Sequence, residues 1–185
     1  MGKNVTVSDG YLRLKAIKES NPGGSSYPYT SGYVITGKVK PGGWFTYGFF
    51  EARLKCPQMN GAWCAFWLWE DPNGSDEIDI TETLGNDNMT HNMNLHGATT
   101  WSRSYRMATP NYEWHVYAID WQPGYIRWYV DNVLTGTYTG TAFNGSSMYL
   151  IFNYQLGGSW AGAVDESKLP NEMLIDFVHV FEVKP

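Results

Sequence analysis

Cysteine is scarce in this chain of 185 residues, and histidine is scattered. The two cysteines, Cys56 and Cys64, are too few for a disulfide framework. The four histidines, at positions 91, 96, 115 and 179, show no clustered spacing with cysteine of the kind that forms a zinc site. We therefore expect no catalytic metal, and we expect Cys64 to be a buried free thiol.

Positive charge is also sparse. Thirteen Lys and Arg stand against eighteen Asp and Glu, and the basic residues form no stripe that could follow a phosphate backbone. A nucleic-acid partner is therefore not expected. No apolar run is long enough to span a bilayer, and residues 1–10 lack the apolar segment of a signal peptide. We expect no membrane association, and we expect a secreted protein whose signal peptide is absent from this chain.

Helical periodicity is weak, whereas apolar and polar residues alternate with period two between Gly, Asn, Asp and Pro punctuation. Two packed antiparallel sheets, a β-sandwich, suit this all-β pattern. With 43% hydrophobic residues, we expect a single domain over residues 1–185. Loops are expected over residues 21–28 and 161–170, the second with one helical turn. Strands are expected over residues 11–17, 32–39, 47–56, 62–69, 77–83, 89–97, 113–121, 125–132, 147–156 and 173–183.

Aromatic residues are abundant, at 16% of the chain, with nine Trp and thirteen Tyr. Their flat faces pack against the apolar faces of sugar rings as well as in cores. Because neighbouring strand residues point to opposite sides, Trp63, Trp67 and Trp69 share one face. The same alternation places a polar set opposite the aliphatic residues of two other strands: Asn92, Asn94, His96, Asn153 and Gln155. This face is typical of a groove that binds an amphipathic ligand such as a polysaccharide.

Four carboxylates lie within the strand-like stretch GSDEIDITETLG, residues 74–85. Glu77 and Asp79 share a face, whereas strict alternation would point Glu82 into the core, where an unpaired carboxylate is costly to ionise. One extra residue, a β-bulge near Ile80, would return Glu82 to the face of the other two acids. Two carboxyl groups about 5 to 5.5 Å apart suit a retaining glycosidase. Asp79 between them could share a proton and separate their pKa values.

Two other interpretations of the acidic strand compete with catalysis. Acidic residues can bind Ca²⁺, but calcium loops place Gly and Asn turns between the acids, whereas these acids alternate with Ile. The strand could instead be a solvated edge whose charges prevent aggregation. The neighbouring groove of Trp, Asn and His favours catalysis over both.

The segment EIDITE resembles the E-x-D-x-x-E signature of glycoside hydrolase family sixteen, in the bulged form of laminarinases, agarases and carrageenases. The resemblance implies a β-jelly roll with a concave cleft and retaining hydrolysis of internal β-linkages in glucans or galactans. It makes Glu77 the nucleophile, Asp79 the assisting acid and Glu82 the acid/base. Further segments are similar in the family's order: YTSGYVITG, YGFFEARLK, GAWCAFWLW, HVYAIDWQPGYIRWYVDN, LIFNYQLGGSW and LIDFVHVFEV.

The resemblance also implies substrate contacts. His96 matches an LH position that would contact the acid/base region, although a lone histidine can also be structural. Asn153 and Gln155 match positions that face the cleft. For the tryptophans we expect three locations: Trp63 and Trp67 stacking on sugars, Trp101 and Trp160 on the cleft rim, and Trp114, Trp121 and Trp128 in the packing of the other sheet.

Other features depart from the family pattern. Cys64 stands where many laminarinases have Pro, GSD replaces the Trp that commonly precedes the signature, and the usual N-terminal strand is expected to be lacking. Gly10 and Asp176 match two ligands of a Ca²⁺ that the family often binds on its convex side, and the third would lie in that strand. They are candidate ligands of a structural Ca²⁺, and no cofactor is expected to be required.

Three functions are weighed. A monomeric endo-β-glucanase acting on β-1,3 or mixed β-1,3/1,4 linkages is favoured, because residues 117–132 resemble the corresponding lichenase segment. An agarase-like or carrageenase-like galactanase is the alternative within the family, and the expected cleft face holds no Arg or Lys for a sulfated chain. A non-catalytic carbohydrate-binding sandwich is the third, and the intact acids argue against it.

Overall fold

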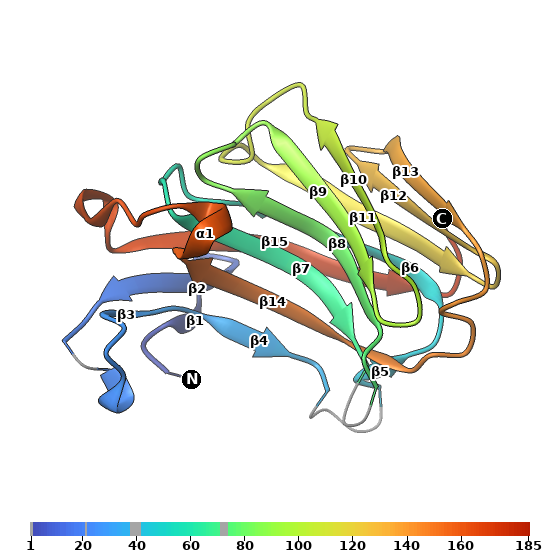
Figure 1. Ribbon diagram of the computed structural model, residues 1–185, viewed down its shortest axis with the longest axis horizontal. Helices are drawn as coiled ribbons and strands as arrows, with labels where there is room; N and C mark the ends of the chain where they lie inside the picture. The colour runs from blue at the N-terminus through green and yellow to red at the C-terminus, as the bar shows by residue number, and fades with distance from the viewer. Residues whose placement is uncertain (1, 21, 38–41, 71–73) are drawn as a thin grey trace.

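The computed structural model describes residues 2–20, 22–37, 42–70 and 74–185. Two antiparallel sheets face each other across one apolar core (Figure 1). In Figure 1 the strands β7 to β10 and β14 lie in front of β6, β11, β12 and β15. The arrangement confirms the β-sandwich that the alternating pattern predicts.

The first sheet has the strand order β1-β2-β15-β6-β11-β12-β13, with β3 paired to β2. Its alternating apolar residues face the second sheet and its charged residues face outward. In chain order the strands are β1 (Val5–Ser8), β2 (Tyr11–Lys18), β3 (Tyr29–Thr30), β6 (Gly48–Lys55), β11 (His115–Gln122), β12 (Tyr125–Val130), β13 (Val133–Thr139) and β15 (Asn171–Phe181).

The second sheet has the order β10-β9-β8-β7-β14-β4, with β5 paired to β14. Because β8 is central, its side chains have neighbours on both sides, which positions the acids. The strands are β4 (Tyr33–Ile35), β5 (Trp44–Phe45), β7 (Ala62–Trp69), β8 (Glu77–Leu84), β9 (Thr90–His96), β10 (Trp101–Arg106) and β14 (Met148–Leu156).

Helical structure is confined to short turns in the described ranges. They are η1 (Pro22–Gly24), α1 (Gly158–Ala161) and η2 (Glu166–Lys168), and η2 confirms the helical turn expected within residues 161–170. None of the helices in the described part of the chain has the length and apolar character needed to cross a bilayer. The strand expected over residues 32–39 ends at Ile35, and residues 38 and 39 lie outside the described ranges.

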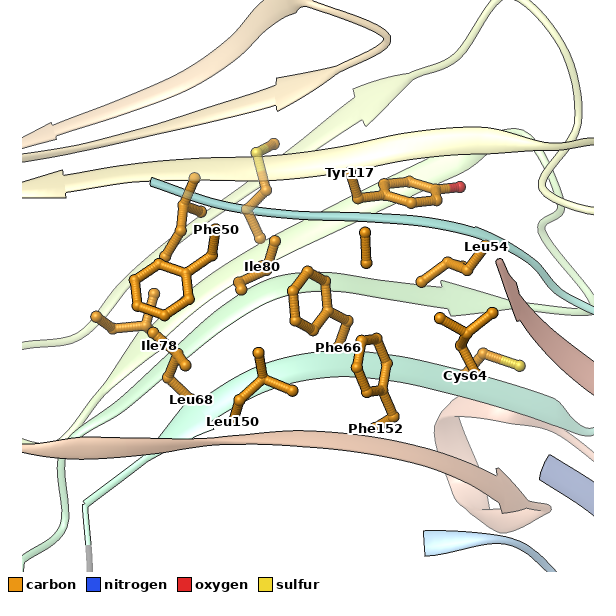
Figure 2. Close-up of a cluster of buried hydrophobic side chains, with 14 of the residues drawn as sticks. Phe50, Leu54, Cys64, Phe66, Leu68, Ile78, Ile80, Tyr117, Leu150 and Phe152 are labelled. Atoms are coloured by element: carbon orange, nitrogen blue, oxygen red, sulfur yellow. The ribbon is translucent and has the colours of Figure 1, made fainter. Parts of the chain in front are cut away.

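The core fills the space between the sheets with aliphatic and aromatic side chains (Figure 2). Phe66 of β7 and Phe152 of β14 stack with ring centroids 4.5 Å apart. Cys64 lies among them and is a buried free thiol, as expected, and burial raises its pKa well above the ordinary value. Residues labelled in the core of Figure 2 include Phe50, Leu54, Leu68, Ile78, Ile80, Tyr117 and Leu150.

The tryptophans expected to pack divide into two groups. Trp121 and Trp128 are fully buried in the core, as predicted. Trp114 precedes β11, where it stacks on Tyr11 and lies under the Arg53 guanidinium. The rim location expected for Trp101 is wrong, because this residue begins β10 and stacks on Trp128 with centroids 4.7 Å apart.

Candidate active site

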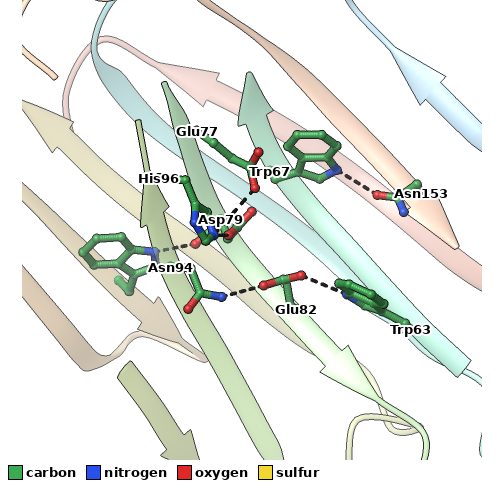
Figure 3. A network of polar contacts seen from close by, with 9 residues as sticks. Trp63, Trp67, Glu77, Asp79, Glu82, Asn94, His96 and Asn153 are labelled. Atoms are coloured by element: carbon green, nitrogen blue, oxygen red, sulfur yellow. Dashed lines mark hydrogen bonds and ion pairs between the residues drawn. The ribbon is translucent and has the colours of Figure 1, made fainter. Parts of the chain in front are cut away.

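The three acids of the signature lie on β8, which a β-bulge interrupts at Ile80. The register with β7 passes from Asp79 to Thr81 on consecutive β7 residues, so Ile80 has no partner there. Ile80 and Thr81 both point into the core, with exposed fractions of 0% and 1%. The extra residue therefore returns Glu82 to the face of Glu77 and Asp79, as predicted, and Figure 3 shows the three acids on that face.

Both carboxylate oxygens of Glu82 accept hydrogen bonds from neighbouring strands (Figure 3). Trp63 Nε1 of β7 donates to Oε1 at 2.9 Å, and Asn94 Nδ2 of β9 donates to Oε2 at 2.5 Å. Burial raises the pKa of Glu82, and the two hydrogen bonds oppose that rise. The side chain is thus held between two fixed donors while its protonated form is favoured by burial.

His96 lies beside the other two acids. Its Nε2 atom is 3.4 Å from Asp79 Oδ2 and 3.9 Å from Glu77 Oε1. His96 therefore lies at the Glu77 and Asp79 end of the acid cluster, and Glu82 acts on it through its charge. The reason is the antiparallel register, in which His96 pairs with Glu77 while Asn94 pairs with Asp79 and its side chain reaches Glu82. Asn94 is the residue that the sequence argument placed on the right face without assigning this contact.

The electrostatics of the cluster follow from its burial. Desolvation raises the pKa of Glu77 to about 7, and the neighbouring Asp79 charge adds to the rise. Desolvation likewise raises the pKa of Asp79 to about 6, while His96 lowers it. The contact with Asp79 raises the pKa of His96 in turn. Burial thus raises the pKa of all three acids above that of an exposed carboxyl, while His96 opposes the rise at each of them.

This shift gives a prediction for stability. A carboxyl whose pKa rises from about 4.5 to about 7 on folding binds more protons when folded, so stability falls as the pH rises through that window. Glu77→Gln removes the cost of ionising this group. At pH 8 we expect the variant to have a free energy of unfolding about 1 to 2 kcal/mol above that of the wild type, after allowance for solvent screening, and therefore a higher melting temperature. The advantage should shrink towards pH 5.

Thermal melts of both proteins across pH 5 to 8 measure the difference. Glu113→Gln, at an exposed position ahead of β11, serves as the matched control. A melting difference for Glu77→Gln that stays constant with pH would contradict the raised pKa.

The acids open into a pocket of about 180 Å³. Trp67 is half-buried in its wall, and its Nε1 atom donates to Asn153 Oδ1 at 2.7 Å. Trp63 meets Trp160 of α1 edge to face at 4.9 Å, and Trp160, which is 40% exposed, thus lies beside the pocket wall. The lining residues are Trp63, Ala65, Trp67, Glu77, Asp79, Glu82, Asn153 and Gln155. The pocket thus brings together most of the predicted substrate residues with the three acids.

A second hollow, of about 520 Å³, adjoins the first and shares Asn153 and Gln155 with it. Three of its four tyrosines come from the segment YPYTSGY, where the sequence analysis assigned no site residue although their dense spacing was a usable signal. Tyr27 and Tyr29 meet edge to face at 5.3 Å, and Tyr33 is 52% exposed. The groove therefore extends beyond the acids across β14 and offers further aromatic surface.

Gly10 and Asp176 are the two candidate ligands of a structural Ca²⁺. Gly10 lies in the turn between β1 and β2 with φ of 83°, and Asp176 accepts a hydrogen bond from Arg53 at 2.7 Å. Within the described ranges, the only group of three His, Cys, Asp or Glu side chains that could hold a metal is Glu77, Asp79 and His96. Ca²⁺ takes six to eight oxygen ligands, so Gly10 and Asp176 alone would not complete a calcium site.

A β-sandwich whose groove presents bulge-aligned acids beside tryptophans is the arrangement of a glycoside hydrolase. The model of the glycosyl hydrolases family 16 matches residues 2–178, and the chain belongs to this family. The resemblance inferred from EIDITE and its flanking segments is therefore confirmed.

Relatives and solved structures support the same family. The chain is 32% identical to the beta-glucanase of Rhodothermus marinus, over 97% of this chain and 70% of the relative. It is also 32% identical to the keratan-sulfate endo-1,4-beta-galactosidase of Sphingobacterium multivorum, over 80% of this chain but only 40% of the relative. The laminarinase catalytic domain of Thermotoga maritima matches with a TM-score of 0.86 at 28% identity, covering all of this chain and 82% of that one.

Proposed function

We propose that this chain is a retaining endo-β-glucanase that cleaves internal β-1,3 or mixed β-1,3/1,4 linkages. The observation that carries the proposal is the β-bulge, which places Glu77, Asp79 and Glu82 on one face, in one pocket with two tryptophans. The beta-glucanase and laminarinase among the similar proteins support glucan as the substrate.

In the proposed reaction, the Glu77 carboxylate attacks the anomeric carbon while Glu82 gives its proton to the departing glycosidic oxygen. A glycosyl ester on Glu77 and a free sugar hydroxyl result. Glu82, now a carboxylate, then takes a proton from water, and the hydroxide attacks the same carbon and releases Glu77. Asp79 and His96 lie beside Glu77 and stabilise its carboxylate as the negative charge is lost in the ester and restored on hydrolysis.

Trp67 is expected to contribute apolar contact area to sugar binding. Truncation to Ala removes an apolar face from the groove, so affinity for a laminari-oligosaccharide or mixed-linkage oligosaccharide should fall by about 1 to 3 kcal/mol, the scale of one large apolar contact. Calorimetric titration in a Glu77→Gln background measures binding without turnover, and a melt of each variant accompanies it.

Trp67→Phe is the matched control, because it keeps an aromatic face while removing the hydrogen bond to Asn153 and part of the indole's area. It should bind closer to the parent than Trp67→Ala does. Unchanged affinity of Trp67→Ala, with a stability loss of about 3 to 5 kcal/mol, would instead mark a core residue and would overturn the proposed position of the cleft.

A galactanase is the second candidate function, and a basic residue on the cleft face of β10 favours it. The sequence argument found no Arg or Lys on the cleft face, but it missed β10. There Ser104 pairs with Asn92 and Arg106 with Thr90, so by alternation Arg106 lies on the face of Ser104 and is exposed. A cation here would suit a sulfated chain, and one relative is a keratan-sulfate galactosidase.

A reducing-end assay across laminarin, lichenan, agarose, carrageenan and keratan sulfate separates these functions. We expect turnover of laminarin or lichenan. Turnover restricted to the galactans would favour the second candidate. Binding to any of these polysaccharides without hydrolysis would favour the non-catalytic sandwich.

We also propose an oligomeric state, a location and partners for the chain. The chain would act as a monomeric, secreted hydrolase with a polysaccharide as its partner and with no nucleic-acid or membrane partner. No cofactor would be required for turnover. A structural Ca²⁺ at Gly10 and Asp176 stays a prediction, and it would need ligands besides these two residues.

A further inference from the structure

The β-bulge of β8 has two backbone carbonyl groups that accept hydrogen bonds from buried side chains. A bulge disrupts the ladder locally, and buried backbone groups need other partners. The carbonyls belong to Asp79 and Ile80, two of the four residues between Glu77 and Glu82 in the sequence. Hydrogen bonds that hold these two carbonyl groups in place therefore also hold the spacing of the two proposed catalytic carboxylates.

Trp128 provides the first donor from the opposite sheet. It lies on β12 with no exposed surface, and its Nε1 atom donates to the Asp79 carbonyl at 2.8 Å. Facing sheets lie about 10 Å apart, a span that an indole can cross. Trp101 stacks on Trp128 at 4.7 Å with an interplanar angle of 17°, which holds the indole in place.

His91 provides the second donor from the neighbouring strand β9. Its Nε2 atom lies 2.9 Å from the Ile80 carbonyl, and the residue is fully buried. A carbonyl can only accept, so the proton is on Nε2, and the buried Nδ1 has no hydrogen-bond partner among the described residues. Burial lowers the pKa of His91 to about 4, so the ring stays neutral and keeps this tautomer at neutral pH.

The bulge and the two donors depend on one another. Without the extra residue, Glu82 would point into the core and lose its contacts with Trp63 and Asn94. In that register neither ring donor would have its present acceptor, and a buried donor without a partner is costly. The two side chains thus favour the bulged register over the regular one.

We propose that His91 and Trp128 are positioning residues, which hold the bulge from inside the sandwich and thereby set the place of Glu82 relative to Glu77. This inference rests on the proposed function for its catalytic consequence. Neither residue touches substrate, so their removal should change the rate of the chemical steps more than the binding of the polysaccharide.

His91→Phe and Trp128→Phe each remove the donor and keep a ring. On laminarin or the preferred glucan we expect kcat to fall by at least about tenfold, with KM changed by less than about threefold, because small displacements of catalytic groups are costly. His91→Gln can place an amide N–H near the Nε2 position, and it should recover most of the lost kcat. Leu150→Ala is the control, since it opens the same core away from the bulge.

A measurement independent of turnover is the indole ¹H–¹⁵N resonance of Trp63, which reports the hydrogen bond to Glu82 and is assigned by its loss in Trp63→Phe. We expect it to shift in His91→Phe and Trp128→Phe and to stay in place in Leu150→Ala. If resonance and kcat in both ring variants match the Leu150→Ala control, the positioning role is overturned. If the wild type hydrolyses no polysaccharide, the proposed function fails, and the resonance alone decides the positioning role.

Discussion

Glu77→Gln should abolish turnover of the glucan while leaving the fold intact. An amide keeps the volume and much of the hydrogen bonding of the carboxyl group, but it cannot form the glycosyl ester. We expect kcat to fall by at least about 10⁴-fold, the scale seen when a nucleophile is removed. Reducing-end release from laminarin and lichenan measures the loss, and far-ultraviolet circular dichroism with a thermal melt shows that the protein is folded.

The outcome separates catalysis from binding. Because the groove of Trp63 and Trp67 is left untouched, Glu77→Gln should bind oligosaccharides with nearly wild-type affinity. Glu113→Gln, away from the acids, should keep full activity. Substantial activity in a correctly folded Glu77→Gln protein would contradict the nucleophile assignment and would direct attention to Asp79.

Much of the site could be predicted because the decisive patterns lie within single strands. Glu82 has the wrong parity for a regular strand, and the cost of a buried carboxylate leaves a bulge as the simple solution. The faces of Trp63 and Trp67 follow from alternation alone. These arguments need only one strand at a time, so the sequence contains everything they require.

Contacts between strands were harder to predict. The Asn94 contact with Glu82 and the place of His96 depend on how β9 aligns with the bulged β8, and a bulge shifts that register by a residue. The Trp128 bond to the Asp79 carbonyl joins two sheets. Nothing in the local pattern states which strands face each other, so such contacts become visible only in the fold.

The edge strand β10 shows another limit. Its sequence, WSRSYR, carries polar or charged residues on both faces, since Arg103 shares by alternation the face of Trp101 and Tyr105, which pack against the core. Edge strands commonly carry such charges, which discourage pairing with other chains. The charges that suit an edge strand also break the apolar–polar alternation, which is why the sequence pattern predicts a rim position for Trp101 and gives no signal for Arg106.

The final prediction concerns Glu82, which holds the acid/base role in the proposed reaction. Glu82→Ala should lower polysaccharide hydrolysis by about 10² to 10⁴-fold, the usual contribution of general acid–base catalysis. An aryl glycoside with a good leaving group needs little protonation, so it should still glycosylate Glu77. Deglycosylation should then be slow, because no base remains to activate water.

Added azide should speed that second step. It needs no base, and the space left by the carboxylate retains the two donors Trp63 Nε1 and Asn94 Nδ2, which suit a small anion. The product should be a glycosyl azide of retained configuration, identified by NMR or mass spectrometry. Asp79→Asn, tested alongside, should show no such rescue, because the acid/base is still present. If Glu82→Ala neither keeps activity on the aryl glycoside nor responds to azide, the acid/base role belongs to another group, and the proposed pairing of Glu77 with Glu82 across the bulge fails.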